Sequence, residues 1–179
     1  MAPSQARERL LAAAVEQALH GGVIGQSLRQ IAAAVGTSHR MLLYHFGSRE
    51  GLLVAISNAI NEAVAGTLDR WAEPRELFEH FAGPEAWPGV RLFFELYAHA
   101  LLGGPGSDEF FDASVRRWID GLAGELVRHG ADEATARIQA RLHLAVARGL
   151  LLDLLATKDR EEVSQAYEYY LRLAGRPPG

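Results

Sequence analysis

The sequence predicts an all-α fold of about nine helices, and three observations point to it. Every segment that is long enough repeats its apolar residues with the period of a helix. β-Branched residues are too sparse for strands. The 179 residues are 49% apolar and 22% charged, which is ordinary globular composition, so a chain of this length can bury a core without disulfides or metals.

Cap residues and glycines mark the first four helices. Gly21 and Gly22 supply a C-terminal stop for the first helix. Ser27, Ser38 and Ser48 each precede an apolar periodic run, as N-caps do. We expect these four helices at residues 4–20, 27–35, 38–46 and 48–71.

Proline and glycine divide the remainder of the chain. Pro74 precedes a short helix, and Pro88 opens a longer one whose predicted buried face is Val90, Phe93, Phe94, Tyr97 and Leu101. Ser107 or Asp108 caps the seventh helix, and Asp132 and Asp159 cap the last two. The expected ranges are 75–81, 88–102, 107–130, 132–157 and 159–174, followed by a frayed tail at 175–179.

The helix predicted at 132–157 is apolar almost all the way round between Leu142 and Ala156. Such a helix needs cover on both sides. A second copy of the chain is the simplest cover, so we expect a homodimer through the helices at 132–157 and 159–174. The alternative is a central helix buried within one subunit.

Several functional classes are disfavoured by what the sequence lacks. Without cysteine there are no disulfides, cysteine-bound metals or thiol nucleophiles, which suits a cytoplasmic protein. The longest apolar run, 142–156, is too short and too charged for a membrane span, and no signal peptide precedes Arg7. Because hydrolase, phosphate-loop and zinc-protease motifs are missing, we expect no enzyme, no cofactor and no metal site.

The charge is distributed unevenly. The net charge is −4, but residues 1–55 hold five arginines against three glutamates, and no carboxylate occurs between Glu16 and Glu50. A polyanion therefore meets no acidic repulsion from that window.

Residues 27–46 have the pattern of a helix-turn-helix. Ala32 is small where two crossing helices must approach, and Gly36 four residues later suits the turn. Ser38 caps the second helix and leaves His39 and Arg40 at an N-terminus of the kind that enters the DNA major groove. By spacing alone, a plain α-hairpin remains the alternative.

These residues resemble the N-terminal domain of the TetR family of bacterial transcriptional regulators. The resemblance covers residues 5–55 and lies in Arg9-Leu10-Leu11, Gly22, Ser27, Ile31-Ala32, Val35-Gly36-Thr37-Ser38, Leu42, His45-Phe46 and Ser48-Arg49-Glu50-x-Leu52. It implies a DNA-binding domain at 1–50 and a helical ligand-binding and dimerisation domain at 51–179. It also implies a homodimer that binds a palindromic DNA operator and is released by a small-molecule effector. The alternatives are a helical protein-interaction module or a regulator that activates.

The matched positions supply candidate DNA-binding residues. Leu43 departs from the family pattern, which has tyrosine there, and Tyr44 follows one place later. Arg40 can read guanine or pair with a phosphate, and His45 is either a phosphate contact or a packed structural histidine. The candidates are Ser27, Arg29, Thr37, Ser38, His39, Arg40, Tyr44, His45 and Arg49.

Aromatic residues crowd the expected ligand-binding region. An aromatic cavity with few polar groups suits a flat or apolar effector. The candidate ligand-binding residues are Phe81, Trp87, Phe94, Tyr97 and Trp118.

Overall fold

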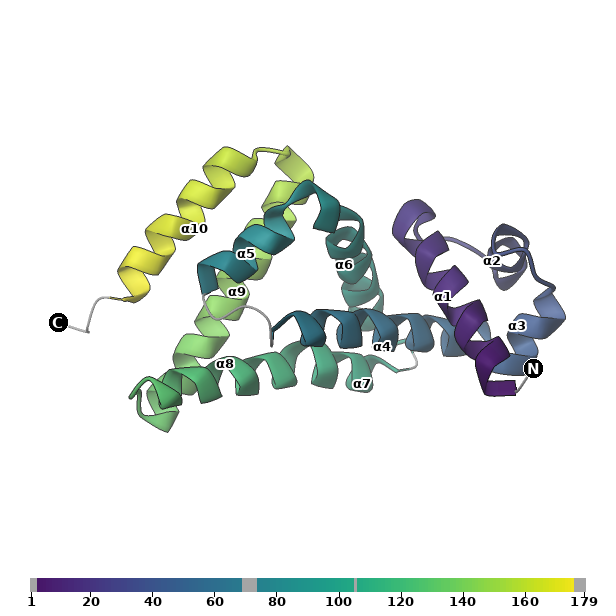
Figure 1. Cartoon of the computed structure of the whole chain (residues 1–179), viewed down its shortest axis with the longest axis horizontal. Helices are drawn as coiled ribbons and strands as arrows, with labels where there is room; N and C mark the ends of the chain where they lie inside the picture. Colours follow the sequence, from purple (N-terminus) through teal and green to yellow (C-terminus); the bar gives the residue numbers. More distant parts are fainter. Residues whose placement is uncertain (1–2, 69–73, 105, 176–179) are drawn as a thin grey trace. The chain divides into compact units, whose positions relative to one another are not determined.

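The computed structural model describes residues 3–68, 74–104 and 106–175, which confirm the all-α class (Figure 1). Every regular element in these ranges is a helix. None of the described helices is long and apolar enough to cross a membrane. The chain divides into two compact units, residues 1–67 with 88–111, and residues 68–87 with 112–179.

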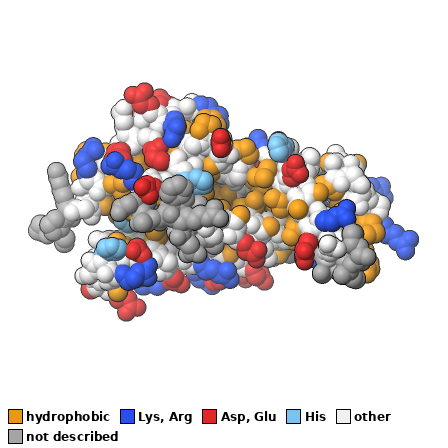
Figure 2. Space-filling view, viewed as in Figure 1, with side chains coloured by type: hydrophobic (Ala, Val, Ile, Leu, Met, Phe, Trp, Pro, Cys, Tyr) orange, Lys and Arg blue, Asp and Glu red, His pale blue; other side chains and the backbone are white. Residues whose placement is uncertain are grey.

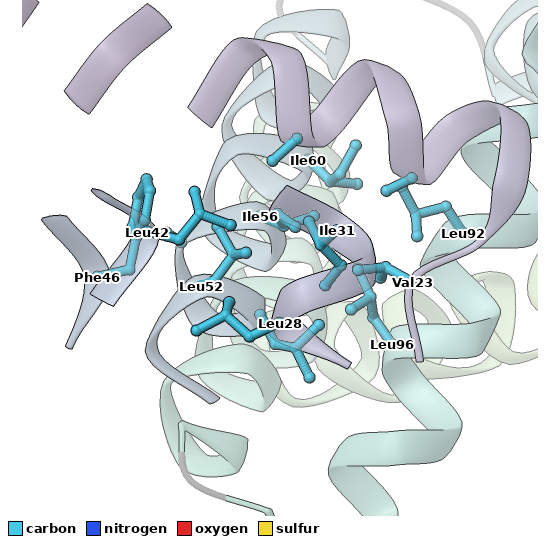
Figure 3. Packing of buried hydrophobic residues seen from close by; sticks show 14 of the residues in the cluster. Val23, Leu28, Ile31, Leu42, Phe46, Leu52, Ile56, Ile60, Leu92 and Leu96 are labelled. Carbon is cyan, nitrogen blue, oxygen red and sulfur yellow. The ribbon is translucent and has the colours of Figure 1, made fainter. Parts of the chain in front are cut away.

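The first unit joins the N-terminal helices to two helices from later in the sequence. Its elements are α1 (Pro3–Gly21), α2 (Leu28–Ala34), α3 (His39–Phe46), α4 (Arg49–Leu68), α6 (Trp87–Leu101) and α7 (Ser107–Phe111). Ile31, Leu42, Leu52, Ile56 and Leu92 are its largest fully buried apolar side chains, and Figure 3 shows them converging from α2, α3, α4 and α6. One core therefore fixes the α2–α3 pair on α4 and α6.

The predicted caps of α2 and α3 form as expected. Ser27 Oγ accepts a hydrogen bond from the Gln30 amide at 3.3 Å, and the Ser27 amide donates to Gln30 Oε1 at 2.8 Å, which completes a capping box. Ser38 Oγ accepts from the Met41 amide at 3.2 Å. Gly36 has φ +70°, which confirms the turn conformation that its lack of a β-carbon permits.

The second unit consists of α5 (Pro74–Ala82), η1 (Pro84–Ala86), η2 (Asp112–Arg116), α8 (Arg117–Arg128), α9 (Glu133–Thr157) and α10 (Arg160–Ala174). Helices α8 and α9 share an apolar core that includes Ile119 and Leu144. The Phe78 ring of α5 stacks on the Tyr167 ring of α10 with centroids 3.9 Å apart. The caps predicted at Asp132 and Asp159 are confirmed.

The seventh predicted helix is not a single α-helix, which corrects the expectation for residues 107–130. Its residues run through α7, a π-helical segment at Asp112–Arg116 (η2) and α8. Ser114 in that segment is fully buried, and the Arg148 guanidinium donates a hydrogen bond to its carbonyl oxygen. This bond satisfies a carbonyl where the regular helical pattern is interrupted.

The predicted buried face of α6 was also partly wrong. Val90 is buried, but Leu101 is 66% exposed, while Leu92 and Leu96 are almost completely buried. The helix packs on two sides, because Phe93 and Tyr97 meet Phe110 of α7, each with ring centroids 5.9 Å apart. The predicted end of α4 near Trp71 and most of the predicted tail lie outside the described residues.

The domain boundary predicted between residues 50 and 51 separates DNA-binding residues from ligand-binding residues. The two compact units are defined differently, by which helices pack together, and the first unit groups α4, α6 and α7 with the N-terminal helices. The functional boundary therefore stays a prediction.

Candidate nucleic-acid interface

Helix α3 presents one face to the core and the other to solvent. Leu42 and Phe46 are buried one turn apart, so side chains on the opposite side point outward. Arg40 and Tyr44 lie on that outer side, and Tyr44 is 72% exposed. Figure 2 shows basic side chains, all arginine in this unit, at the end of the first unit where α1, α2 and α3 lie. The arrangement leaves a cationic, aromatic surface beside the N-terminus of α3.

The remaining candidates at the helix starts lie around this surface. Arg29 is exposed in the first turn of α2, and His39 is half-buried in the first turn of α3. Thr37 is half-buried in the turn, where its amide donates to the Ala32 carbonyl at 2.9 Å. Ser27 and Ser38 are exposed, but their hydroxyl groups already cap α2 and α3. The structure thus places these predicted residues at the starts of α2 and α3 and in the turn between the two helices.

His45 points into the protein more than toward the outer face of α3. The residue is half-buried, and its Nε2 atom is buried without a hydrogen-bond partner among the described residues. Its ring makes an edge contact with Tyr44, with centroids 4.9 Å apart. This placement favours the packed-histidine alternative over a phosphate contact.

Arg49, predicted as a phosphate contact, directs its guanidinium toward the loop before α2. Its Nε donates to the Gln26 carbonyl at 2.8 Å, and its Nη2 donates to the Ile24 carbonyl. Nη1 lies 3.7 Å from Glu50 Oε1. These contacts hold the loop that precedes the helix-turn-helix on the first turn of α4. They favour a structural role over direct contact with DNA.

We therefore expect Arg49→Ala to lower the free energy of unfolding by about 2 to 4 kcal/mol. The change removes two partly buried, charge-assisted hydrogen bonds, each of which contributes about 1 to 2 kcal/mol or more. Urea denaturation measures the loss, and Arg29→Ala on the exposed side of α2 is the matched control. An unchanged stability together with a salt slope of DNA binding reduced by about one would instead assign Arg49 to a phosphate.

The predicted ligand-binding residues fall in both units. Phe94 and Tyr97 are half-buried on α6 in the first unit, and the Tyr97 ring lies 5.4 Å from that of Phe111. In the second unit the Phe81 and Trp118 rings are 6.4 Å apart. Trp87 donates its indole N–H to the Ala82 carbonyl at 3.0 Å, so its polar group is occupied. Each unit thus holds part of the predicted aromatic set.

The structure also draws in residues that the sequence analysis did not select. The Arg91 guanidinium of α6 donates to the Leu19 and His20 carbonyls at 3.1 and 3.4 Å, so α6 caps the C-terminal end of α1. No local motif marks such a contact between residues 71 and 72 positions apart. Leu43 and Met41 are each 39% exposed on α3. Both are exposed because they lie on either side of Leu42, which is completely buried.

Comparison with known proteins places this interface in a family. Residues 10–56 match the family model described as bacterial regulatory proteins, tetR family. The HTH-type transcriptional regulator RutR of Escherichia coli O157:H7 is 34% identical over 141 residues, which are 76% of this chain and 62% of RutR. The chain therefore spans less than two thirds of the length of this curated relative.

Solved structures share the fold. A transcriptional regulator from Rhodococcus sp. Rha1 superposes with a TM-score of 0.74 at 20% identity, covering 96% of this chain and 99% of that one. The multidrug binding protein EbrR complexed with ethidium gives a TM-score of 0.68 at 24% identity and covers 92% of this chain and 97% of EbrR. At 20% and 24% identity, these similarities show a shared fold and nothing more specific.

Proposed function

Because this chain belongs to the TetR family of bacterial regulatory proteins, we propose that it is a DNA-binding transcriptional regulator. It acts as a repressor that binds a palindromic operator as a homodimer and leaves it when a small molecule binds. Residues 1–50 bind DNA, and residues 51–179 bind the effector and the second subunit.

The outer surface of α2 and α3 carries the proposal. Arg29, Arg40 and Tyr44 are exposed there beside two capped helix N-termini, whose free amides favour phosphate. No carboxylate occurs in the sequence from residue 17 to residue 49. Binding to a random DNA duplex at low salt tests the proposal, because a helical protein-interaction module would not bind the duplex.

The dimer uses α9 and α10 in this proposal. Three large apolar side chains project from α9 into solvent, with Ile138, Leu142 and Leu152 exposed to 70%, 52% and 53%. Together with Ala145 and Gly149 they follow each other at intervals of four and three residues. That spacing gives a continuous seam along one side of a helix, as in helices that pair lengthwise.

Helix α10 extends the same kind of surface. Tyr169 and Leu173 are exposed on it one turn apart, next to the exposed Ala166. A pair of such helices from each subunit forms a four-helix interface. Stable interfaces of this type bury about 2,000 Å² or more in total.

The effector is proposed to be a flat aromatic molecule that binds beside α6. EbrR, whose fold is similar, was solved with ethidium and with imidazole. In this chain Phe94 and Tyr97 supply half-buried rings on α6, and Phe93 lies 5.3 Å from Phe94 in an edge-to-face contact. Aromatic faces of this kind suit a planar ligand.

Helix α6 also offers a route from the effector to the DNA-binding helices. Arg91 lies one turn before Glu95 on α6 and bonds to the last carbonyls of α1, and a β-carbon on Gly22 would lie 3.2 Å from Glu95 Oε2. A shift of α6 therefore moves the end of α1 without passing through α4. The ligand shifts the population toward the released state by its preference for that state.

We expect Phe94→Leu and Trp118→Leu to change effector response while effector-free operator affinity stays near that of the wild type. Each change removes an aromatic ring from one of the predicted ligand-binding residues, Phe94 in the first unit and Trp118 in the second, and leaves the α2–α3 surface intact. A thermal-shift screen of planar aromatic compounds supplies the effector, and operator binding with and without it gives the result. Wild-type release in both variants, combined with loss of release on changing α10, would place the site elsewhere.

A further inference from the structure

Helix α3 exposes three large apolar side chains beside the exposed Arg40. Met41, Leu43 and Tyr44 are all among the exposed large apolar residues of the chain. Leu43 is 39% exposed although the adjacent Leu42 is completely buried. The exposed leucine contributes to no apolar core cluster of the first unit. Its position thus calls for an explanation other than packing within the subunit.

The neighbours of Leu43 on α3 are the two residues at the helix N-terminus that is proposed to enter the major groove. Because residues three and four apart lie next to each other on a helix, Leu43 adjoins Arg40 and His39. Met41, in contrast, lies on the flank that carries His45. Helical side chains also lean toward the N-terminus, which brings the leucine methyl groups over the first turn of α3.

Only one feature of the base edges in the major groove is apolar. Adenine, guanine and cytosine present hydrogen-bond donors and acceptors there, whereas thymine also presents its C5-methyl group. A leucine side chain has no charge and no hydrogen-bond donor, so Leu43 cannot bind a phosphate. Beside Arg40 it can, however, pack against the thymine methyl group and bury it.

We propose that Leu43 is a specificity-determining residue that contacts the C5-methyl group of a thymine in each half-site. The thymine lies next to the base pair that His39 and Arg40 approach. This inference rests on the proposed function, since it requires α3 to enter the major groove. It adds a direct, apolar reading of sequence to the polar contacts proposed for the same helix.

Replacement of thymine by deoxyuridine tests the contact, because it removes only the methyl group. The operator obtained by selection from random duplexes is resynthesised with deoxyuridine at each thymine in turn, and its affinity is measured by fluorescence anisotropy. For the wild type we expect a loss of about fourfold at one thymine of each half-site, the contribution of one buried methyl group. Replacement in both half-sites should cost about sixteenfold.

The variants identify the residue that senses the methyl group. Leu43→Ala should bind the thymine and deoxyuridine operators equally well at that position. Met41→Ala, a matched control with the same exposed fraction on the same helix, should keep the wild-type penalty. Because both side chains are exposed, the variants should fold, and circular dichroism checks this.

Two results would overturn the inference while the proposed function stands. One is a wild-type affinity that no deoxyuridine replacement lowers. The other is a Leu43→Ala variant that retains the wild-type penalty at every thymine. Failure of the wild type to bind any duplex would overturn the proposed function itself and this inference with it.

Discussion

Operator affinity is expected to fall by about 10³ to 10⁵ between about 50 and 200 mM salt. The dimer would make about 6 to 10 phosphate contacts, and each contact releases counterions from the DNA. In each subunit the exposed Arg29, Arg40 and Tyr44 and the amides at the starts of α2 and α3 are available for this purpose. Fluorescence anisotropy at a series of salt concentrations gives the slope.

The overall charge of the chain makes this result informative. With a net charge of −4 the protein as a whole repels DNA, so a steep salt dependence must come from a local basic surface. Arg29→Ala should reduce the slope by about one per subunit that contacts the duplex. A flat salt response in the wild type would be incompatible with phosphate contacts at α2 and α3.

Loss of the dimer should weaken operator binding by about 10² to 10⁴-fold, the gain that a second linked binding module provides. The double variant Leu142→Glu, Leu152→Glu places carboxylates in the apolar seam of α9. In a two-fold symmetric dimer the interface contains both copies of each residue, so four carboxylates would be buried there without partners. Sedimentation velocity should show a folded monomer, and anisotropy should show the loss of affinity.

An exposed aliphatic residue outside α9 and α10 provides the control. Val127 of α8 is 43% exposed, so Val127→Glu adds a carboxylate to the same unit without touching the proposed seam. This variant should remain dimeric with near wild-type affinity. A wild-type chain that sediments as a stable monomer at micromolar concentration would refute the proposed interface.

The helix boundaries of this fold were predictable because local chemistry sets them. Ser27, Ser38, Asp132 and Asp159 cap helices where the sequence predicted, since each side chain accepts a hydrogen bond from the amide three residues ahead. Gly36 takes the positive φ that its place in the turn suggested. The class and the order of the helices follow from such signals.

Long-range contacts were beyond the reach of sequence reasoning. The π-helical segment around Ser114 involves a hydrogen bond from Arg148, 34 residues away. The true buried face of α6 depends on the fact that α7 covers its second side. A helical periodicity shows which residues share a face, but it does not show how many faces are covered.

In the candidate interface, too, some features follow from local helical position and others depend on long-range contacts. Arg40 and Tyr44 are exposed because they lie opposite the buried Leu42, and helical periodicity predicts that relation once one buried position is known. The inward direction of Arg49 depends on carbonyl groups at Ile24 and Gln26, in a loop more than 20 residues away. The sequence shows that Arg49 is a cation, but only the folded structure shows that its guanidinium binds these backbone carbonyls.

Selection of bound duplexes from a random DNA pool by the 179-residue chain tests whether the protein is a dimeric regulator that reads DNA through α3. Such a regulator should enrich one palindrome whose half-sites are separated by about one helical turn, roughly 34 Å, or a little more. Each half-site should include a thymine next to the base pair that Arg40 approaches. No enrichment, or a product without two-fold symmetry, would contradict a dimeric regulator that reads DNA through α3.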